Sequence, residues 1–344
     1  MQAVVKTDKG PGNVVLMDVP VPKPAPNQVL LEVITCGICG TDIHVKNDTF
    51  RNFPPVILGH EFVARVIEEG SEVKDMTQKD RYYAVLGAST VVCGSCEHCK
   101  SGYFMFCPER RGMGHGVNGA FAQYICARPD QLYPLEEGLP VEEGALVEPL
   151  AAAVAAACEN TIVRPGDVAL VSGPGPIGLL IAMVLTFHGS KTIVAGTSMD
   201  TERLQLAQKI GAFRTVDVGK EDLVEICREE TKGRGMDVAF EVSGAEPSAR
   251  ACLESLRPRG SYTQVGHFGK DITVPYDLIG FKQLRVQGSV GYSYDTWNRT
   301  TALIARGLRP TQIVSHRFPL SDWEKGFKAF ENKQATKVLL HPDK

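Results

Sequence analysis

The sequence predicts an α/β protein with a β-rich part and a doubly wound, parallel-sheet part. Residues 1 to about 150 carry short alternating or β-branched runs separated by proline, glycine or asparagine, which is the pattern of strands joined by turns. The clearest of these runs are Gln2–Lys6, Val14–Met17, Gln28–Thr35 and Phe62–Glu68. From about 150 to 285, strand-like and helix-like segments alternate, which indicates parallel strands joined by crossover helices.

The alternating part opens with Val168–Ser172, a continuous apolar run of the kind found in strands buried on both faces. Its further elements are expected, in chain order, at Ile177–His188 (helix), Thr192–Ala195 (strand), Arg203–Ile210 (helix), Val238–Val242 (strand) and Ser261–Val265 (strand). After it we expect a strand at Val286–Val290, a helix at Trp297–Arg306 and a closing strand at Lys337–His341. Alanine-rich Leu150–Ala157 indicates a tightly packed helix between the two parts.

The composition favours a soluble globular protein of ordinary charge. Lysine plus arginine number 37 against 40 aspartate plus glutamate, a formal charge of −3, so no basic field points to nucleic acid or an anionic membrane. No run of about 18 apolar residues could span a bilayer. The N-terminal residues also lack the charged-then-apolar pattern of a signal peptide. We therefore expect a cytoplasmic protein whose partner is a small molecule.

Four of the ten cysteines lie close together, as Cys93-x2-Cys96-x2-Cys99-x7-Cys107. In a chain of this length without an export signal, such a cluster favours a metal over disulfides. Four thiolates fill a tetrahedral zinc shell and leave no position open, so a zinc ion here would be structural. His98 lies within the loop but would be a fifth ligand, and we expect it to be exposed.

A second possible zinc site combines residues that are far apart in the sequence. Cys36 and His60 would supply sulfur and nitrogen, and Glu61 or Glu148 would supply a carboxylate oxygen. Three protein ligands leave a position for water or substrate, so this zinc would be catalytic and act as a Lewis acid. Glu148 precedes a proline where the two parts of the chain meet and a cleft is expected.

A glycine-rich turn directly follows the apolar strand and opens the expected helix: Gly173-Pro174-Gly175-Pro176-Ile177-Gly178. In this strand–turn–helix setting the spacing indicates a dinucleotide site. The first glycine allows a tight turn, the second a close approach of the pyrophosphate, and the third close packing of helix on strand. The pyrophosphate would meet free N–H groups at the positive end of the helix dipole.

The choice between NAD and NADP depends on the residue after the next strand, where an NAD-binding protein presents an acid to the adenosine ribose. Ser198 stands at this position, and the missing carboxylate removes repulsion of a 2′-phosphate. Arg203 is the nearest candidate partner for that phosphate. Asp200 is the alternative ribose acid and would favour NAD. The pattern leans towards NADP.

Together these motifs resemble the zinc-dependent medium-chain dehydrogenase/reductase family, in its sorbitol, threonine and sugar-alcohol dehydrogenase branch. The resemblance runs nearly from end to end and rests on the motifs above together with four further stretches. These are Gly37-Ile38-Cys39-Gly40-Thr41-Asp42-x-His44, Gly59-His60-Glu61, Gly119-Ala120-Phe121-Ala122-Gln123-Tyr124 and Glu148-Pro149. The resemblance implies a GroES-like catalytic domain formed by residues 1–150 and 286–344, with a Rossmann dinucleotide-binding domain, residues 151–285, inserted between them.

The resemblance also implies a reaction, in which hydride passes between a secondary alcohol and C4 of the nicotinamide. The ligands implied for the catalytic zinc are Cys36, His60 and either Glu61 or Glu148. In several members the glutamate that matches Glu61 moves on and off the metal. Thr41 would pass the substrate proton on, and His44 would deliver it to solvent. Dimers and tetramers both occur among relatives, so a homo-oligomer is expected.

One departure from the family pattern bears on the substrate. Sorbitol dehydrogenases carry an arginine in the strand after the Rossmann domain that contacts substrate hydroxyls, and Gly291 stands at that point here. This departure argues against a sorbitol-like polyol. A sugar alcohol, a sugar acid and a hydroxy amino acid are the substrate classes that the resemblance implies. A function of another class is a dinucleotide-binding relative without dehydrogenase activity. The retained zinc and relay residues argue against it, and against a zinc-free quinone reductase.

Overall fold

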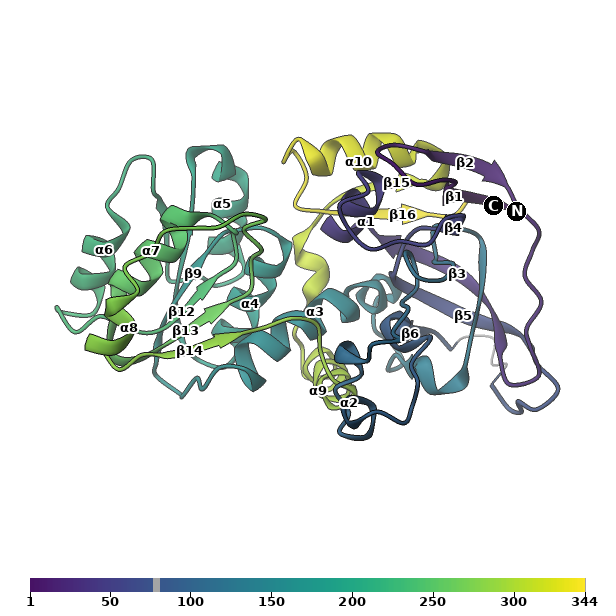
Figure 1. Cartoon of the computed structure of the whole chain (residues 1–344), viewed down its shortest axis with the longest axis horizontal. Helices are drawn as coiled ribbons and strands as arrows, with labels where there is room; N and C mark the ends of the chain where they lie inside the picture. The colour runs from purple at the N-terminus through teal and green to yellow at the C-terminus, as the bar shows by residue number, and fades with distance from the viewer. Residues whose placement is uncertain (77–80, 344) are drawn as a thin grey trace. The chain divides into compact units, whose positions relative to one another are not determined.

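The computed structural model describes residues 1–76 and 81–343. The chain divides into two compact units: unit 1 consists of Met1–Glu148 and Ser293–Lys344, and unit 2 of Pro149–Tyr292. Both ends of the chain therefore belong to unit 1, and unit 2 is an insertion into it (Figure 1). Among the described residues, no helix has both the length and the apolar character needed to cross a bilayer.

Among its described residues, unit 1 has two sheets. The larger has the strand order β15-β16-β3-β5-β6-β8, with β7 paired to β3, and the smaller has the order β2-β1-β4. The strands of the larger sheet are β3 (Val29–Gly37), β5 (Glu61–Glu69), β6 (Tyr83–Val85), β7 (Tyr124–Ala127), β8 (Leu132–Pro134), β15 (Val314–Pro319) and β16 (Lys337–His341). Those of the smaller sheet are β1 (Gln2–Lys6), β2 (Val14–Asp18) and β4 (Val56–Ile57).

The core of unit 1 lies against the larger sheet. Leu31 on β3 and Phe62 on β5 are buried there with Phe121 and with Phe327 of the C-terminal helix. The helices of this unit are α1 (Gly40–Lys46), α2 (Glu97–Lys100), α9 (Tyr294–Ala305) and α10 (Trp323–Glu331). Because α10 packs on β15 and β16, the C-terminal segment completes the core that the N-terminal strands begin.

Unit 2 is a six-stranded sheet with the order β11-β10-β9-β12-β13-β14, and all five neighbouring pairs are parallel. This order is the doubly wound arrangement. The chain first adds strands on one side of β9 and then, starting with β12, on the other side. Ligands bind at such a switch point, outside the carboxyl ends of the strands. The strands are β9 (Val168–Ser172), β10 (Lys191–Gly196), β11 (Arg214–Asp217), β12 (Met236–Glu241), β13 (Leu256–Gln264) and β14 (Arg285–Gly288).

Helices cover this sheet because its central strands are buried on both faces. Every residue of β9 and of β12 is buried. The helices of the unit are α4 (Pro176–Phe187), α5 (Thr201–Lys209), α6 (Leu223–Glu230), α7 (Glu246–Ser255) and α8 (Asp277–Phe281). A further helix, α3 (Val147–Val154), continues as one π-helical segment, Ala155–Glu159, so the expected alanine-rich helix is present.

The predicted α/β class is confirmed, and most expected elements lie within two residues of their predicted ends. The ends of β1, β9 and β16 agree with the prediction. The boundary between the two parts differs, however. Residues 286–292 were expected in the first domain but belong to unit 2, because β14 pairs with β13 in the parallel sheet.

Candidate metal centres and dinucleotide site

One group of potential metal ligands lies in unit 1. Cys39, His60 and Glu61 each place a ligand atom within 4.8 Å of the other two. Cys39 caps the start of α1, and Glu61 begins β5 directly after His60. The segments meet because β3 pairs with β5 so that Gly37, just before this turn, stands opposite Glu61. A thiolate, an imidazole and a carboxylate are the donor set of a zinc site that keeps one position open.

An unsatisfied polar atom in this group supports a metal. The Nδ1 atom of His60 is buried without a hydrogen-bond partner among the described residues, and Asp42 Oδ1 lies 3.6 Å from it. Buried polar atoms without a partner are rare and often mark an ion or a water. Burial opposes a charge on His60, but the Asp42 carboxylate and Cys39 raise the pKa of His60 well above its usual value. Binding of a metal would therefore release a proton.

Asp42 ties the two ligand-bearing segments together. Its Oδ2 accepts a hydrogen bond from the Cys39 amide at 2.9 Å, and its Oδ1 accepts one from the Gly59 amide at 3.2 Å. The side chain is 1% exposed. Sequence reasoning gave Asp42 no role. The available signal was an acidic residue three positions after the cysteine that precedes a helix, a common cap arrangement.

Lys337 is a second residue that sequence reasoning missed. Its ammonium donates to Glu61 Oε2 and, at 2.9 Å, to the carbonyl of Ile38, and both charged side chains are 1% exposed. Burial disfavours the charge, but Glu61 and Cys39 together with other nearby negative charge outweigh burial and raise the pKa of Lys337. The charge of Glu148 acts in the same direction. Glu148 is outside the group of three ligand atoms.

Cys36, the cysteine expected as a zinc ligand, is not in this group. It lies within β3, is 1% exposed and belongs to the apolar core of unit 1. Burial, together with the carboxylates of Asp42 and Glu61, raises the pKa of the Cys36 thiol well above its usual value. The structure thus groups Cys39, and not Cys36, with His60 and Glu61, because β3 holds the first cysteine of the pair against the core and ends before the second.

The expected relay residues lie on α1. The Cys39 sulfur and the Thr41 hydroxyl are 3.7 Å apart, so Thr41 borders the ligand group. His44 stands three residues later, on the same face of the helix. It is exposed, and its Nδ1 lies 3.0 Å from the Thr49 hydroxyl.

The four-cysteine loop is brought together as expected. The sulfurs of Cys93, Cys96, Cys99 and Cys107 all lie within 4.8 Å of one another, and none of them forms a disulfide. Amide groups donate to three of these sulfurs: Cys93 N to Cys107, Cys96 N to Cys93, and Cys99 N to Cys96, at 3.3–3.4 Å. The backbone amides of Cys96 and Ser95 lower the pKa of Cys93 to about 6, which favours the thiolate that zinc requires. His98 is outside the group.

The glycine-rich turn has the shape that a dinucleotide needs. A Cβ at Gly173, which adopts φ 117°, would lie 2.7 Å from Ser243 N, and one at Gly178 would lie 1.9 Å from the Gly173 carbonyl oxygen. A Cβ at Gly175 would meet nothing within 4 Å, so the space beside this residue is open. Pro176 begins α4 with no side-chain cap, which leaves the amides of Ile177 and Gly178 without intrahelical acceptors.

The residues after β10 are engaged with one another. Ser198 donates to both carboxylate oxygens of Asp217, at 3.0 and 2.8 Å. Asp200 accepts from the amide and hydroxyl of Thr197 and pairs with Arg203 at 3.4 Å. The hydrogen bond from Ser198 lowers the pKa of Asp217, so a carboxylate that sequence reasoning missed lies beside Ser198.

Glu241 organises the neighbouring switch point at the end of β12. It is fully buried and accepts hydrogen bonds from Ser243 N at 2.9 Å, Gly244 N at 3.1 Å and Gln264 Nε2 at 2.8 Å. Sequence reasoning did not single it out. A carboxylate directly after the apolar run Val238–Phe240 was the available signal, because buried charges are rare unless they are paired.

Replacing Lys337 with methionine tests the buried ion pair. We expect Lys337→Met to lower the free energy of unfolding by about 3–5 kcal/mol, because Glu61 would keep a buried charge without its cation. Urea unfolding of the metal-free protein measures this loss. Lys325→Met is the control: Lys325 is 67% exposed in an ion pair with Asp322, and its loss should change stability by less than about 0.5 kcal/mol. Equal losses in both variants would contradict the role assigned to Lys337.

Comparison with known proteins agrees with this architecture. A family model described as "Zinc-binding dehydrogenase" matches residues 176–306, and one described as "Alcohol dehydrogenase GroES-like domain" matches residues 25–137. The chain is 36% identical over 344 residues to a sorbitol dehydrogenase of Halalkalibacterium halodurans, covering 99% of each. It is 34% identical to a D-arabitol-phosphate dehydrogenase of Enterococcus avium, covering 99% of this chain and 97% of the relative.

Solved structures extend the same likeness to three dimensions. The 2R,3R-butanediol dehydrogenase of Bacillus subtilis superposes with a TM-score of 0.89 at 29% identity, covering 99% of each chain. The matched families, the full-length coverage and the two groups of potential metal ligands lead to one conclusion. The chain belongs to the zinc-binding medium-chain dehydrogenases, enzymes of the zinc- and NAD(P)-dependent alcohol dehydrogenase family.

Proposed function

We propose that this enzyme oxidises a secondary alcohol of a small polyhydroxylated or hydroxy-acid substrate and transfers the hydride to NAD(P). The observation that carries this proposal is the group formed by Cys39, His60 and Glu61. Three ligands of these types are suited to a zinc ion that keeps a position for substrate. The open space beside Gly175 supports binding of the dinucleotide in the same chain.

Zinc held by Cys39, His60 and Glu61 would polarise the alcohol oxygen as a Lewis acid and lower the pKa of the hydroxyl. The chain's own residues would take the proton away. The Thr41 hydroxyl can accept a proton while it donates its own, which suits a relay. The imidazole of His44 exchanges protons near neutral pH and is exposed, so it would release the proton to solvent.

The carboxylate ligand proposed here is Glu61 rather than Glu148. Glu61 is one of the three grouped residues, whereas Glu148 is not. Glu61 also shares the ammonium of Lys337, which could hold this carboxylate when it is not on the metal. We assign Glu148 a supporting electrostatic role through the same lysine.

The substrate class is argued from the relatives and from one local feature. The similar proteins are named for sorbitol, D-arabitol phosphate and 2R,3R-butanediol, all with secondary hydroxyls. Gly291 stands at the position where the family resemblance implies an arginine in sorbitol dehydrogenases. Its backbone adopts φ 63°, a conformation that suits glycine. Polyols other than sorbitol, sugar acids and threonine should therefore be assayed together, with NAD⁺ and NADP⁺ in parallel.

Exchange of single cysteines tests the catalytic assignment. We expect Cys39→Ser to lower kcat by at least about a thousandfold, because a zinc ligand and the activation it supports are lost. The variant should also lose one of two zinc ions per chain, measured by atomic absorption, and should keep its affinity for NAD(P)H in fluorescence titration.

Cys36→Ser is the matched control, since it removes a buried thiol that lies outside the ligand group. It should retain both zinc ions and most of its turnover, with folding checked by circular dichroism. If the folded Cys36→Ser protein loses a zinc ion and Cys39→Ser keeps both, the assignment of the ligands is wrong.

We propose NADP as the preferred cofactor. Position 198 carries a hydroxyl instead of an acid, and Asp200 is engaged by Thr197 and Arg203. Two positive charges lie near this position: the guanidinium of Arg203, paired with Asp200 at 3.4 Å, and the ammonium of Lys220, 3.0 Å from Asp217. Asp217 opposes this preference, because its carboxylate is hydrogen-bonded to Ser198 and would repel a second negative charge.

Replacing Asp217 with asparagine should shift the cofactor preference further towards NADP. We expect Asp217→Asn to raise the ratio of NADP⁺ to NAD⁺ affinity by about five- to tenfold, since the carboxylate near Ser198 loses its charge. Fluorescence titration with both reduced dinucleotides measures the ratio. Glu229→Gln, on the exposed side of α6, makes the same charge change elsewhere and should leave the ratio as it is. An unchanged affinity ratio in Asp217→Asn would show that Asp217 does not belong to the cofactor site.

We propose further that two copies of the chain associate through the edge of unit 2. β14 pairs only with β13 within the described chain, and all four of its residues are exposed. Large apolar side chains surround this edge: Phe281 is 85% exposed, Val286 47% and Val290 52%. Exposed edges with several apolar side chains around them are normally covered. The free thiols of all ten cysteines support a reducing compartment such as the cytoplasm.

A charge at the centre of β14 should prevent this association. We expect the Val286→Asp protein to be a monomer and the unaltered protein to be at least a dimer. Light scattering after size-exclusion chromatography measures both masses. Val21→Asp introduces the same charge at an equally exposed valine of unit 1 and should leave the mass unchanged. A Val286→Asp protein that keeps the mass of the unaltered protein would place the interface elsewhere.

A further inference from the structure

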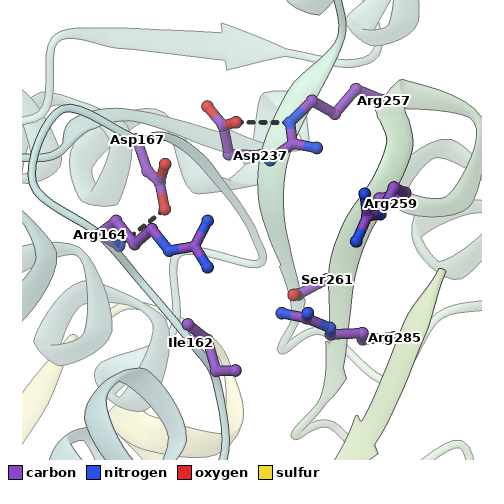
Figure 2. A pocket seen from close by; sticks show the side chains of 8 residues that line it. All are labelled: Ile162, Arg164, Asp167, Asp237, Arg257, Arg259, Ser261 and Arg285. Carbon is purple, nitrogen blue, oxygen red and sulfur yellow. Dashed lines mark hydrogen bonds and ion pairs between the residues drawn. The ribbon is translucent and has the colours of Figure 1, made fainter.

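A positively charged cavity lies at the amino ends of the strands in unit 2. Its volume is about 190 Å³, and its lining includes Asp167, Asp237 and the arginines Arg164, Arg257, Arg259 and Arg285 (Figure 2). Asp167 immediately precedes β9, and Asp237 is the second residue of β12. Arg257 and Arg259 lie in the first half of β13, and Arg285 is the first residue of β14. The glycine-rich turn follows the carboxyl end of β9, so the cavity and the dinucleotide site are at opposite edges of one sheet.

One of the two carboxylates is already neutralised. Asp237 accepts hydrogen bonds from Arg257 Nε at 2.6 Å, from both terminal nitrogens of Arg234 at 2.5 and 2.7 Å, and from the Val168 amide at 2.9 Å. Burial opposes its ionisation, but these donors hold the pKa of Asp237 far below its usual value. Asp237 thus stays charged and is shared between two guanidinium groups.

Three arginines of the cavity have no such partner. Within the described residues, the guanidinium groups of Arg164, Arg259 and Arg285 form no hydrogen bond or ion pair with another side chain. Asp167 uses its Oδ2 to accept the backbone amide of Arg164 at 2.7 Å. Four arginines against two aspartates leave the lining with an excess of positive charge, and Arg234, which binds Asp237 from outside the lining, adds to it.

These three guanidinium groups are directed towards the same space. Figure 2 shows Arg164 reaching in from one side and Arg259 and Arg285 from the other, with the Ser261 hydroxyl beside Arg285. Arg259 is held there in a left-handed backbone conformation, φ 60°, with its amide bonded to the carbonyl of Lys282. Residues other than glycine seldom adopt this conformation, and where they do, a functional constraint is a common reason.

We propose that this cavity binds a phosphate group, either inorganic phosphate or a small phosphate monoester, at a site separate from the dinucleotide site. Like charges that converge without carboxylate partners are stabilised by an anion, and guanidinium groups match phosphate oxygens with paired hydrogen bonds. Phosphate carries close to two negative charges at neutral pH, which the excess positive charge of the lining would offset.

The size of the cavity narrows the ligand further. Pockets for drug-sized molecules measure roughly 300–1,000 Å³, so a cavity of about 190 Å³ holds a phosphate with a small substituent but no dinucleotide. The proposal does not depend on the hydride transfer proposed above, since none of these residues belongs to the metal or cofactor groups.

Isothermal titration calorimetry of the zinc-loaded enzyme, saturated beforehand with NADP⁺, tests the site. We expect one inorganic phosphate per chain with a dissociation constant below roughly 1 mM, unaffected by the dinucleotide. Glycerol 2-phosphate, titrated in parallel, distinguishes the two possible ligands. If it binds at least about tenfold more tightly than inorganic phosphate, the ligand is a phosphate monoester; if its binding is similar or weaker, the ligand is inorganic phosphate. Citrate that binds more tightly than both phosphates would overturn the assignment of a phosphate.

Paired charge-removing variants locate the binding. Arg164→Gln/Arg259→Gln should weaken phosphate binding by about a hundredfold, which is a tenfold loss for each guanidinium removed. This pair leaves β14 unaltered, so a changed association of copies cannot explain the loss. Lys209→Gln/Arg228→Gln removes the same charge from exposed positions on α5 and α6 and should bind as the unaltered protein does.

Several outcomes would overturn the proposal. These are phosphate binding that does not saturate by about 10 mM, binding that disappears when the dinucleotide site is filled, and binding that is equal in the two double variants. Unaltered NADPH affinity of Arg164→Gln/Arg259→Gln, measured by fluorescence, verifies that the variant is folded and that the loss concerns this cavity alone.

Discussion

The pairing of β3 with β5 is the constraint on which the candidate catalytic centre depends. It sets Gly37 opposite Glu61, and a Cβ at residue 37 would lie 2.5 Å from Glu61 Oε2 and 3.0 Å from Lys337 Cε. Glycine is therefore needed for the buried carboxylate and ammonium to meet. A shift of this ladder by one residue would turn Glu61 to the other face of the sheet. The position of the carboxylate thus follows from the sheet register, and α1 then carries Cys39 to the same point.

Sequence patterns predicted the strands and helices well where the pattern itself determines the structure. The apolar run of β9 and the glycine turn after it are local signals, since burial on both faces and backbone conformation act on neighbouring residues. The end of the inserted domain was harder to place. Alternation within residues 285–290 marks a strand but does not say which sheet it joins, and the structure pairs it with β13.

The candidate site was predicted in kind but not in every residue, for two physical reasons. Spacing shows that Cys36 and Cys39 lie near each other, but only the end of β3 decides which of them faces the core. Lys337 lies 276 residues from its partner Glu61, and no pattern in one sequence links residues at that distance. The sequence shows that residues 42 and 217 are aspartates, but it does not show their hydrogen bonds with Cys39 and Ser198, because these depend on the folded backbone.

The four-cysteine loop has a consequence for how this part of unit 1 keeps its shape. Between Cys93 and Cys107, the regular elements are the four-residue α2 and the single turn Phe104–Phe106. Segments this short do not persist on their own, because too few backbone bonds repay the ordering of the chain. The sulfurs and the amides that donate to them supply the missing cohesion. Loss of zinc should therefore loosen the whole segment from Cys93 to Cys107 together, while the surrounding strands keep their structure.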